Sequence, residues 1–398
     1  MNISKRNSII YLISQFTFSL LFTAPIWFVF YLLKDVSEAQ ISLIVTIQYL
    51  SQMIWELPSG ALADILGRKN IVIIAFILSI IAYLFMPFVS GFIPFLILSI
   101  LSSIGDSFRS GSEEALIYDS YLQDDNEKGI DKLYLWSNNI YQLGLILGAV
   151  LGGYLYTINN ALPFYLYTLS LVIGLIANFF YIEPKIDSVK FSVENYLLQI
   201  RDGIKEIFKS QQSRLISFFY IFVGGIAWTS TLYFNEVMMV ELGFNDVQRG
   251  VYSGVMRLIN IVLITFVLNK SGLFNKSRII YFFIITVLIA YLPGIWLEGN
   301  IGLIFIQIAM IITTARWVIL SPMVNKYFSS KYRATAISTL SLLIGFVYVF
   351  ATGLSAYIIP VYGVKVMYTI LGVVGLFTVL PMGIKLLESI KIENMSAK

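Results

Sequence analysis

The chain has 398 residues, of which 58% are hydrophobic and only 13% are charged, whereas soluble domains carry about 25% charged residues. This composition predicts an integral membrane protein. The lack of histidine and cysteine excludes disulfides, Cys/His zinc sites and Ser-His-Asp triads. The net charge of +4 comes from basic residues in short loops rather than from a basic stripe, so nucleic acid is not an expected partner.

Apolar segments of about 20 residues, each long enough as a helix to cross a bilayer, recur along the whole chain. We predict twelve membrane-spanning helices, at residues 9–33, 41–60, 71–89, 92–119, 133–157, 162–182, 215–239, 248–268, 279–297, 301–325, 335–358 and 364–387. The predicted fold class is therefore an all-α membrane protein. The first span follows a basic start but is too long for a signal peptide, so we expect it to remain uncleaved.

Basic residues indicate the orientation of these spans. If the amino terminus is cytoplasmic, nearly all lysines and arginines of the loops fall on the inner side. Only Lys34, Arg249 and Lys365 then fall on the outer side. We therefore expect both termini in the cytoplasm and assume the plasma membrane of a bacterium as the location.

The loop after the second span reads "ELPSGALADILGRKN" at 56–70. In spacing, charge and position between spans it resembles motif A of the major facilitator superfamily. The matching residues are Gly60, Leu62, Asp64, Gly67, Arg68 and Lys69. Ile65 stands where the family usually has a basic residue. The resemblance implies a transporter of twelve helices, in two six-helix halves related by a pseudo-twofold axis.

Motif A takes part in gating in that family. The resemblance implies that Asp64 lies at the positive amino end of the eleventh span, where a carboxylate is stabilised by the helix dipole. It also implies that Arg68 pairs with an acid at the cytoplasmic end of the fourth span, which is Asp119 here. The alternative is that Arg68 and Lys69 are only topology signals.

The fourth span ends in "GDSFRSGSEEALIYDS" at 105–120, which places charges at bilayer depth. At about 100° per residue, Asp106, Arg109 and Glu113 share one narrow arc of the helix, so both acids can reach the arginine. Charge at this depth is costly unless it faces protein or water, so we expect the stripe to line a cavity. Alternatively, Glu113 and Glu114 are interfacial acids at the end of a long helix.

Buried carboxylates can carry protons, and an adjacent arginine favours their ionised form. Our candidates for proton coupling are Asp106 first, then Glu113 and Glu56. Arg109 is the neighbouring cation, and it lies near the position where the resemblance places the arginine of motif B. A purely structural ion pair is the alternative for each acid.

The fifth span contains "GLILGAVLGG" at 144–153, which resembles motif C of the antiporters of the same superfamily. The antiporter-like glycines are Gly144, Gly148, Gly152 and Gly153, and Ala149 replaces the family's proline. The resemblance favours efflux. Glycines four residues apart also serve general helix packing, which is the alternative.

Further side chains inside the predicted spans are candidates for a substrate cavity. The polar ones are Asn138, Asn139, Gln142, Glu236, Arg257 and Arg316. Trp27, Tyr31 and Trp228 could supply an aromatic wall, although Trp and Tyr also gather at membrane interfaces.

The longest polar segment lies between the sixth and seventh spans. Within it Val193, Leu197, Ile200, Ile204 and Ile207 recur at helical spacing, which predicts an amphipathic helix along the inner membrane face. We therefore expect a six-helix half at 1–182, a cytoplasmic linker at 183–214 and a second half at 215–398, the organisation of transporters built from repeats.

The favoured interpretation is a secondary active transporter that exports an amphipathic small molecule or drug by alternating access, with protons as the coupling ion. An importer or facilitator of a polar or anionic metabolite is the alternative, because intramembrane arginines suit carboxylate or phosphate. No phosphate-binding loop of the G-x-x-x-x-G-K-[ST] type occurs, so we expect no nucleotide. We expect no cofactor and no metal, and a monomer in the lipid bilayer.

A remote alternative is an intramembrane enzyme that uses "QDDNEKGID" at 123–131. Asp124, Asp125 and Asp131 could hold Mg²⁺ against a diphosphate. Lys128 within the cluster, and the lack of a second acidic cluster, favour a solvated loop instead. A non-transporting sensor would need a soluble output domain, for which the sequence has no room.

Overall fold

The computed structural model describes residues 2–185, 193–268, 275–329 and 332–396, and all regular secondary structure in these ranges is helical. The α-helices are α1 (Ile3–Ser19), α2 (Trp27–Leu33), α3 (Glu38–Leu66), α4 (Arg68–Phe85), α5 (Phe92–Gln123), α6 (Ile130–Ile158), α7 (Leu162–Asn178), α8 (Val193–Phe208), α9 (Gln211–Thr229), α10 (Asn235–Glu241), α11 (Asp246–Leu268), α12 (Lys276–Tyr291), α13 (Gly299–Ala315), α14 (Ser321–Asn325), α15 (Arg333–Tyr362), α16 (Val364–Phe377) and α17 (Val379–Ser396). Three 3₁₀ turns are η1 (Met86–Phe88), η2 (Glu127–Gly129) and η4 (Gly294–Trp296), and two π-helical segments are η3 (Ser230–Phe234) and η5 (Arg316–Leu320). Each predicted span corresponds to one helix or to consecutive helices, so the all-α fold with twelve spans is confirmed.

By length and apolar composition alone, seven helical stretches of the described ranges could cross a membrane. They are Arg68–Phe88, Phe92–Gln123, Glu127–Ile158, Gln211–Glu241, Gly299–Asn325, Thr335–Tyr362 and Val364–Ile392. The other predicted spans are shorter or more polar. For example, α1 has 17 residues and buries Asn7, Ser14 and Gln15. Polar groups at this depth need partners within the protein, and α1 finds them in neighbouring helices.

Two spans that the sequence predicts as continuous helices are broken in the structure. The first is interrupted between α1 and α2, and the twelfth is interrupted at Thr378 between α16 and α17. Pro25 lies in the first break and Pro381 lies three residues beyond the second. Proline lacks the backbone N–H that a continuous helix needs and clashes with the preceding turn, so it disfavours a continuous helix at both places.

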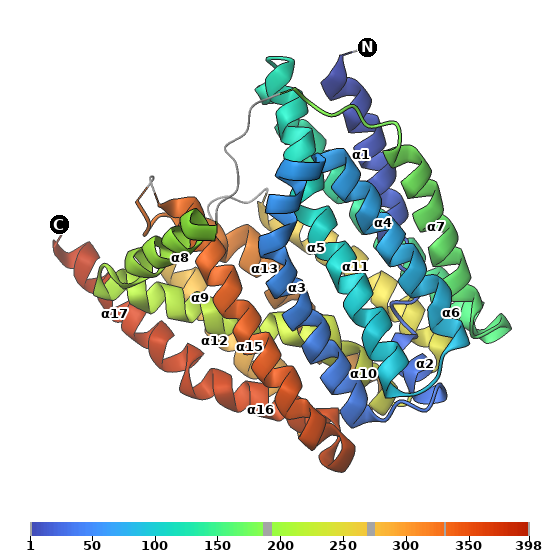
Figure 1. Cartoon of the computed structure of the whole chain (residues 1–398). Coiled ribbons are helices and arrows are strands. Elements are labelled where there is room, and N and C mark those ends of the chain that lie inside the picture. The colour runs from blue at the N-terminus through green and yellow to red at the C-terminus, as the bar shows by residue number, and fades with distance from the viewer. Residues whose placement is uncertain (1, 186–192, 269–274, 330–331, 397–398) are drawn as a thin grey trace. The chain divides into compact units, whose positions relative to one another are not determined.

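The helices form two compact units, of which the first comprises Met1–Val193 and Asn245–Arg257. In this unit α5 lies between α3 and α4, and α1 packs against α6 and α7 (Figure 1). The core between α1, α4, α5 and α7 is built from large apolar and aromatic side chains, including Phe76, Leu116, Tyr167 and Leu171. A second cluster around Phe108 and Ala63 joins α3 to α5.

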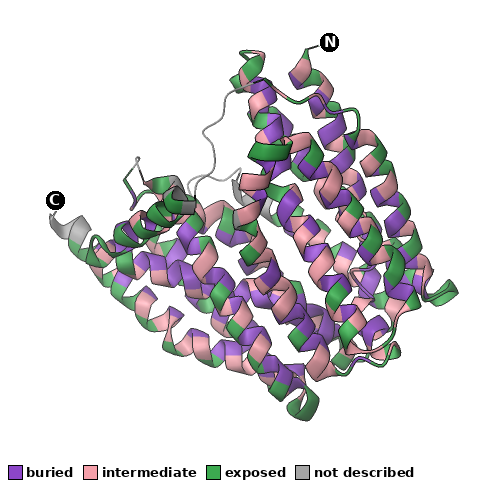
Figure 2. Cartoon of the chain, in the orientation of Figure 1, coloured by how far each residue is buried: buried purple, intermediate pink, exposed green. Residues whose placement is uncertain are grey.

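The second unit comprises Glu194–Phe244 and Leu258–Lys398. Helix α9 packs against α13, α15 and α17, and α12 packs against α13 and α16. In the stretch from Gln211 to Glu241, 67% of the most apolar 18-residue segment is buried. The corresponding share in the other long apolar stretches is 33–44%. Helix α9 is therefore the central helix of this unit, and buried residues follow it closely in Figure 2.

Helix α8 is the helix predicted in the linker. Gly203 allows close packing on α15, since a Cβ atom at this position would lie 2.1 Å from Oγ1 of Thr339. Ile207 is buried, whereas Leu197 and Ile204 of the predicted apolar face are exposed. The exposed apolar side chains are compatible with the predicted amphipathic helix, and its position along the inner membrane face stays a prediction.

Glu206 fastens α8 to the chain that follows α14. Its carboxylate accepts the backbone N–H of Ser329 at 2.6 Å and forms a close ion pair with Lys209. Burial by itself raises the pKa of Glu206, but the hydrogen bonds from Lys209 and Ser329 outweigh this effect and lower the pKa below its usual value. This stabilisation is therefore present above the pKa of an unfolded glutamate and is lost as the pH falls through the lower pKa of the folded state.

We predict that Glu206→Gln loosens α8 from α14, because hydrogen bonds to a charged group contribute about 1.5–3 kcal/mol. Amide hydrogen exchange within 193–208 should become faster than in the unaltered protein. The difference should be the same at pH 7 and pH 5, since both lie above the ordinary pKa of glutamate, about 4.3. Glu194→Gln, at an exposed position of the same helix, is the control and should leave the exchange unchanged. Equal protection of α8 in Glu206→Gln and the unaltered protein would contradict this role.

Candidate functional site

The charged side chains of α5 form a cluster inside the first unit. Arg109 Nη1 lies 3.0 Å from Oε2 of Glu113, one helical turn away. The Glu113 side chain is only 1% exposed, whereas the neighbouring Glu114 is exposed. Helix α1 and the segment after α7 therefore cover Glu113, whereas Glu114 stays at the surface of the unit.

Glu113 receives hydrogen bonds from three other side chains besides Arg109. Ser14 donates a close hydrogen bond, Gln15 Nε2 donates at 3.2 Å, and the Tyr181 hydroxyl donates at 2.9 Å. Four donors satisfy most of the acceptor capacity of an ionised carboxylate. The carboxylate of Glu113 thereby joins α1, α5 and the segment after α7, which makes it a fixed structural anion.

Arg109 is held on two sides. Its guanidinium carbon lies 3.8 Å from the centre of the Phe18 ring, a close cation–π contact, and its Nη1 bonds to Glu113. The Nε of Arg109 is buried and has no acceptor among the described residues. The arginine therefore keeps capacity for one more acceptor.

Asp106 lies one turn before Arg109 and is the least restrained acid of the cluster. It interacts electrostatically with Arg109, and it is close to Tyr83 of α4 and Tyr167 of α7. No hydrogen bond to its carboxylate occurs in the part of the chain that the structure describes. Asp106 is therefore a partly buried carboxylate whose protonation is not fixed by a permanent partner.

The motif A segment lies at the junction of α3 and α4. Arg68 and Asp119 form a close ion pair, which confirms the pairing that the resemblance implied, and Arg68 Nη1 also donates to the Ala115 carbonyl at 2.7 Å. Gly67 has a φ of +86°, a left-handed conformation that strongly favours glycine. Asp64 is exposed on the last turn of α3, and its expected position at the eleventh span stays a prediction.

Sequence reasoning missed Glu183, which completes this corner. Its two carboxylate oxygens accept the backbone N–H groups of Arg68 and Lys69, each at 2.8 Å, at the start of α4. An acid at a helix amino terminus satisfies unpaired donors and the helix dipole. A Cβ at Gly67 would lie 3.5 Å from the Glu183 carboxyl carbon. The only signal in the sequence was an acid directly after the sixth span.

The glycines of α6 form a close helix crossing. Cβ atoms at Gly144, Gly148 and Gly152 would fall within 3 Å of Ser19, the last residue of α1, and of Leu21 and Phe22 in the irregular segment that follows. Gly153 faces the Asp246 carbonyl, and Gly250 of α11, which sequence reasoning missed, faces the carbonyl of Ala149. The row therefore packs α6 against two neighbouring segments.

The remaining first-unit candidates occupy different places. Tyr31 is buried with its hydroxyl 3.3 Å from Ser99, and the Trp27 ring contacts it edge-on at 5.7 Å. Asn138 and Asn139 are exposed on α6, and Gln142 is half-buried. Glu56 is exposed on α3, Gly60 is half-buried there, and Arg257 is half-buried on α11. These residues do not join the cluster on α5.

In the second unit, Arg316 is the most deeply buried charged candidate, at 2% exposure. Its Nη1 donates to the Tyr220 hydroxyl at 3.1 Å, and the guanidinium lies 4.2 Å from the Trp317 ring centre. Trp228 is half-buried on α9 and Glu236 is buried on α10. Sequence spacing could not show that Arg316 begins the π-helical segment η5.

A buried polar network surrounds the other π-helical segment, η3. Ser230 donates to Asn235 Oδ1 at 3.1 Å and accepts from the Tyr291 hydroxyl at 2.9 Å, and Tyr368 makes a close hydrogen bond to Asn235. In addition, the hydroxyl of Thr231 lies 2.7 Å from that of Thr313 on α13. Single π-helical turns within α-helices frequently occur at functional sites. Sequence reasoning missed this network because its members come from four distant segments.

The acidic loop of the enzyme alternative does not form a grouped site. Asp124 accepts the backbone N–H of Ser4 at 2.7 Å, and hydrogen bonds from the side chain and backbone of Ser4 lower the pKa of Asp124. Within the described ranges, no three Asp or Glu side chains are arranged to hold a metal ion.

The sequence profile of the Major Facilitator Superfamily matches residues 8–318. The uncharacterised MFS-type transporter YxaM of Bacillus subtilis (strain 168) is 25% identical over 258 residues, which cover 64% of this chain and 63% of that protein. The match thus spans less than two thirds of the relative's length.

Two solved structures share the fold at low sequence identity. The nucleoside transporter NupG superposes with a TM-score of 0.75 at 14% identity, over 96% of this chain and 98% of the other. A D-xylose–proton symporter superposes with a TM-score of 0.68 at 15% identity, over 96% of each chain.

We predict that Glu113→Gln lowers thermal stability by several degrees, because it removes the charge that Arg109 needs in a buried site. Breaking a buried ion pair on one side costs about 3–5 kcal/mol. Fluorescence-detected thermal unfolding in detergent measures the effect. Glu114→Gln, at the adjacent exposed position, is the matched control and should unfold like the unaltered protein. Equal unfolding temperatures for both variants would refute the anchoring role.

We also predict that Gly67→Ala destabilises the corner between α3 and α4 by about 1–2 kcal/mol, the cost of a side chain in the left-handed region. The same unfolding assay should show the loss. Gly111→Ala on α5 is the control, since its φ is helical and nothing lies within 4 Å of a Cβ there. Identical behaviour of the two alanine variants would mean that the backbone at 67 adapts without strain.

Proposed function

Because the chain belongs to the Major Facilitator Superfamily and is therefore a multi-pass membrane transporter, we propose that it exports an amphipathic small molecule in exchange for protons. Secondary transport follows from the family. The direction, the coupling ion and the substrate class are the parts that we propose.

The observation that carries proton coupling is the division of roles between the two acids on α5. Glu113 is fully occupied by Arg109, Ser14, Gln15 and Tyr181. Asp106 has only electrostatic neighbours. A carboxylate that gains and loses a proton during a cycle must not be locked by permanent donors. Asp106 meets this requirement and Glu113 does not, so we propose Asp106 as the coupling residue. We no longer favour Glu56 for proton coupling, because its side chain is exposed.

Arg109 supplies the means by which protonation acts on the protein. Its charge stabilises ionised Asp106, and this attraction disappears when Asp106 binds a proton. The two protonation states of Asp106 would therefore differ in their affinity for substrate, and antiport requires that the ionised state bind the substrate more tightly.

Other features support export of an amphipathic molecule. Trp27, Tyr31 and Trp228 would give apolar contact area, and the glycines of α6 resemble those of antiporters. We propose alternating access by movement of the half at 1–182 against the half at 215–398, with the linker at 183–214 joining them. The motif A residues, with the Arg68–Asp119 pair, would take part in gating. A monomer in the plasma membrane with both termini in the cytoplasm completes the proposal.

The second candidate function is import or facilitated passage of a polar or anionic metabolite. It is favoured by the buried Arg316 and by the polar contact of Gln307 with Asn260 at 2.7 Å. The fold is shared with a nucleoside transporter and with a D-xylose–proton symporter, so polar cargo is compatible with it.

We predict that Asp106→Asn abolishes substrate-driven proton movement. In acid-loaded inside-out vesicles that contain the unaltered protein, adding a lipophilic cation or another accepted drug should release protons from the vesicle lumen. The variant should show at least a tenfold smaller response while still exchanging labelled for unlabelled substrate, because exchange does not require a change of protonation. The matched control, Glu114→Gln, should retain both activities.

Three results would separate the alternatives. Loss of exchange as well as proton release in Asp106→Asn would make Asp106 a structural residue. Proton release that persists in the variant would place coupling elsewhere. If sugars, nucleosides or organic anions cause proton uptake and drugs cause no proton movement, the importer would be favoured.

A further inference from the structure

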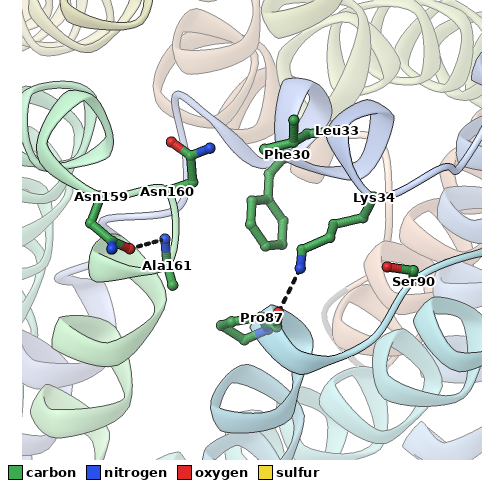
Figure 3. A pocket seen from close by; sticks show the side chains of 8 residues that line it. All are labelled: Phe30, Leu33, Lys34, Pro87, Ser90, Asn159, Asn160 and Ala161. Atoms are coloured by element: carbon green, nitrogen blue, oxygen red, sulfur yellow. Dashed lines mark hydrogen bonds between the residues drawn. The ribbon is translucent and has the colours of Figure 1, made fainter.

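A hollow of about 530 Å³ lies in the first unit, and none of its lining residues belongs to the charged cluster on α5. It is lined by Phe30, Leu33, Lys34, Pro87, Ser90, Asn159, Asn160 and Ala161. These residues come from the end of α2, the turn η1 with the loop after it, and the corner between α6 and α7. Figure 3 shows Phe30 and Lys34 on one side of the hollow and the two asparagines on the other.

The hollow lies at a membrane surface. The segments that line it connect successive spans at residues 34–37, 86–91 and 159–161. Each span crosses the membrane once, so these corners face the side opposite Gly67, where α3 ends. The distribution of basic residues predicts that this is the outer side.

Lys34 gives the hollow its charge, since no other lining residue carries one. Its Nζ donates to the Pro87 carbonyl at 2.7 Å and lies 5.7 Å from the centre of the Phe30 ring. An ammonium group has three donors, so two remain for another acceptor. The carbonyl and the ring fix the ammonium in place, which lowers the entropy lost when it binds an anion.

Neutral hydrogen-bonding groups surround this ammonium. Ser90 and Asn160 are exposed, and the structure gives their side chains no partner within the described ranges. Asn159 Oδ1 is occupied by the backbone N–H of Ala161 at 2.8 Å, so its amide nitrogen remains a donor. One fixed cation with hydroxyl and amide donors suits a singly charged phosphodiester.

Leu33 of the lining, and two residues next to lining residues in the chain, are apolar and exposed. Leu33 is 54% exposed, Phe88 is 68% exposed and Ile158 is 61% exposed. Tyr165 stands beside Phe88, with ring centres 6.1 Å apart. In a membrane protein such side chains contact acyl chains, so a ligand of the hollow would have a polar anionic part and a hydrocarbon part.

We propose that this hollow binds the headgroup of an anionic phospholipid of the outer leaflet. The phosphodiester lies against Lys34, the remaining headgroup contacts Ser90 and Asn160, and the acyl chains follow Leu33, Phe88 and Ile158. A lipid in this position bridges α2, η1 and the corner between α6 and α7, so it stabilises the outer end of the first unit independently of the substrate.

Native mass spectrometry of the purified full chain tests the proposal with phosphatidylglycerol as the probe and phosphatidylcholine as the uncharged comparison. We expect phosphatidylglycerol to bind the unaltered protein more tightly. Lys34→Gln should weaken its binding about tenfold, whereas Lys34→Arg should preserve most of it, which shows that the charge matters rather than the fold. Lys365→Gln removes another predicted outer lysine and should leave binding unchanged.

Three results would overturn the proposal. Equal binding of both lipids would remove the requirement for an anion, and equal loss in Lys34→Gln and Lys365→Gln would mean a general charge effect. A third arm adds inorganic phosphate at millimolar concentration. Its failure to displace phosphatidylglycerol is expected, because it lacks acyl chains. Displacement would make the hollow a site for soluble phosphate.

Discussion

The first unit depends on the need to compensate one buried negative charge. Glu113 lies at 1% exposure in a segment that a bilayer surrounds, where an isolated ion would be unstable. It is tolerated because Arg109, Ser14, Gln15 and Tyr181 converge on it from three segments. This convergence fixes α1 and the segment after α7 against α5. The same contacts leave Asp106 without a permanent partner, so structural anchoring and the proposed proton binding belong to different acids on one helix.

Carboxylates also accept backbone N–H groups at the start of two helices, one in each unit. At the start of α4, Glu183 accepts two backbone N–H groups beside Gly67, and at the start of α16, Glu241 accepts the N–H of Val364 at 2.5 Å beside Gly363. Both glycines have positive φ, at +86° and +78°, so the chain turns sharply and presents unpaired donors to the acid. In each case an acid from a distant segment fixes where a helix begins, which couples corners that sequence separates by more than 110 residues.

Irregular helices carry much of the polar chemistry. The break after α1 exposes backbone to the glycines of α6, and the segments η3 and η5 bring Ser230, Thr231 and Arg316 into buried contacts. A regular helix satisfies its own backbone groups and offers only side chains, whereas broken and π-helical turns change which side chains face inward. Single π-helical turns of this kind frequently occur at functional sites.

The sequence by itself determined the membrane class, the approximate positions of twelve spans and the helix in the linker, because hydropathy and helical periodicity are local properties of the chain. The Arg68–Asp119 pair was implied by the resemblance to motif A. It also determined that Asp106, Arg109 and Glu113 share a helix face, since helical periodicity requires it. Only the tertiary structure decided which acid is fixed, because Ser14 and Tyr181 reach Glu113 from segments about 100 and 70 residues away, and no local pattern encodes such partners. For the same reason Glu183, the network around Asn235 and the hollow at Lys34 were invisible in the sequence, since each exists only where loops or helices distant in the chain meet.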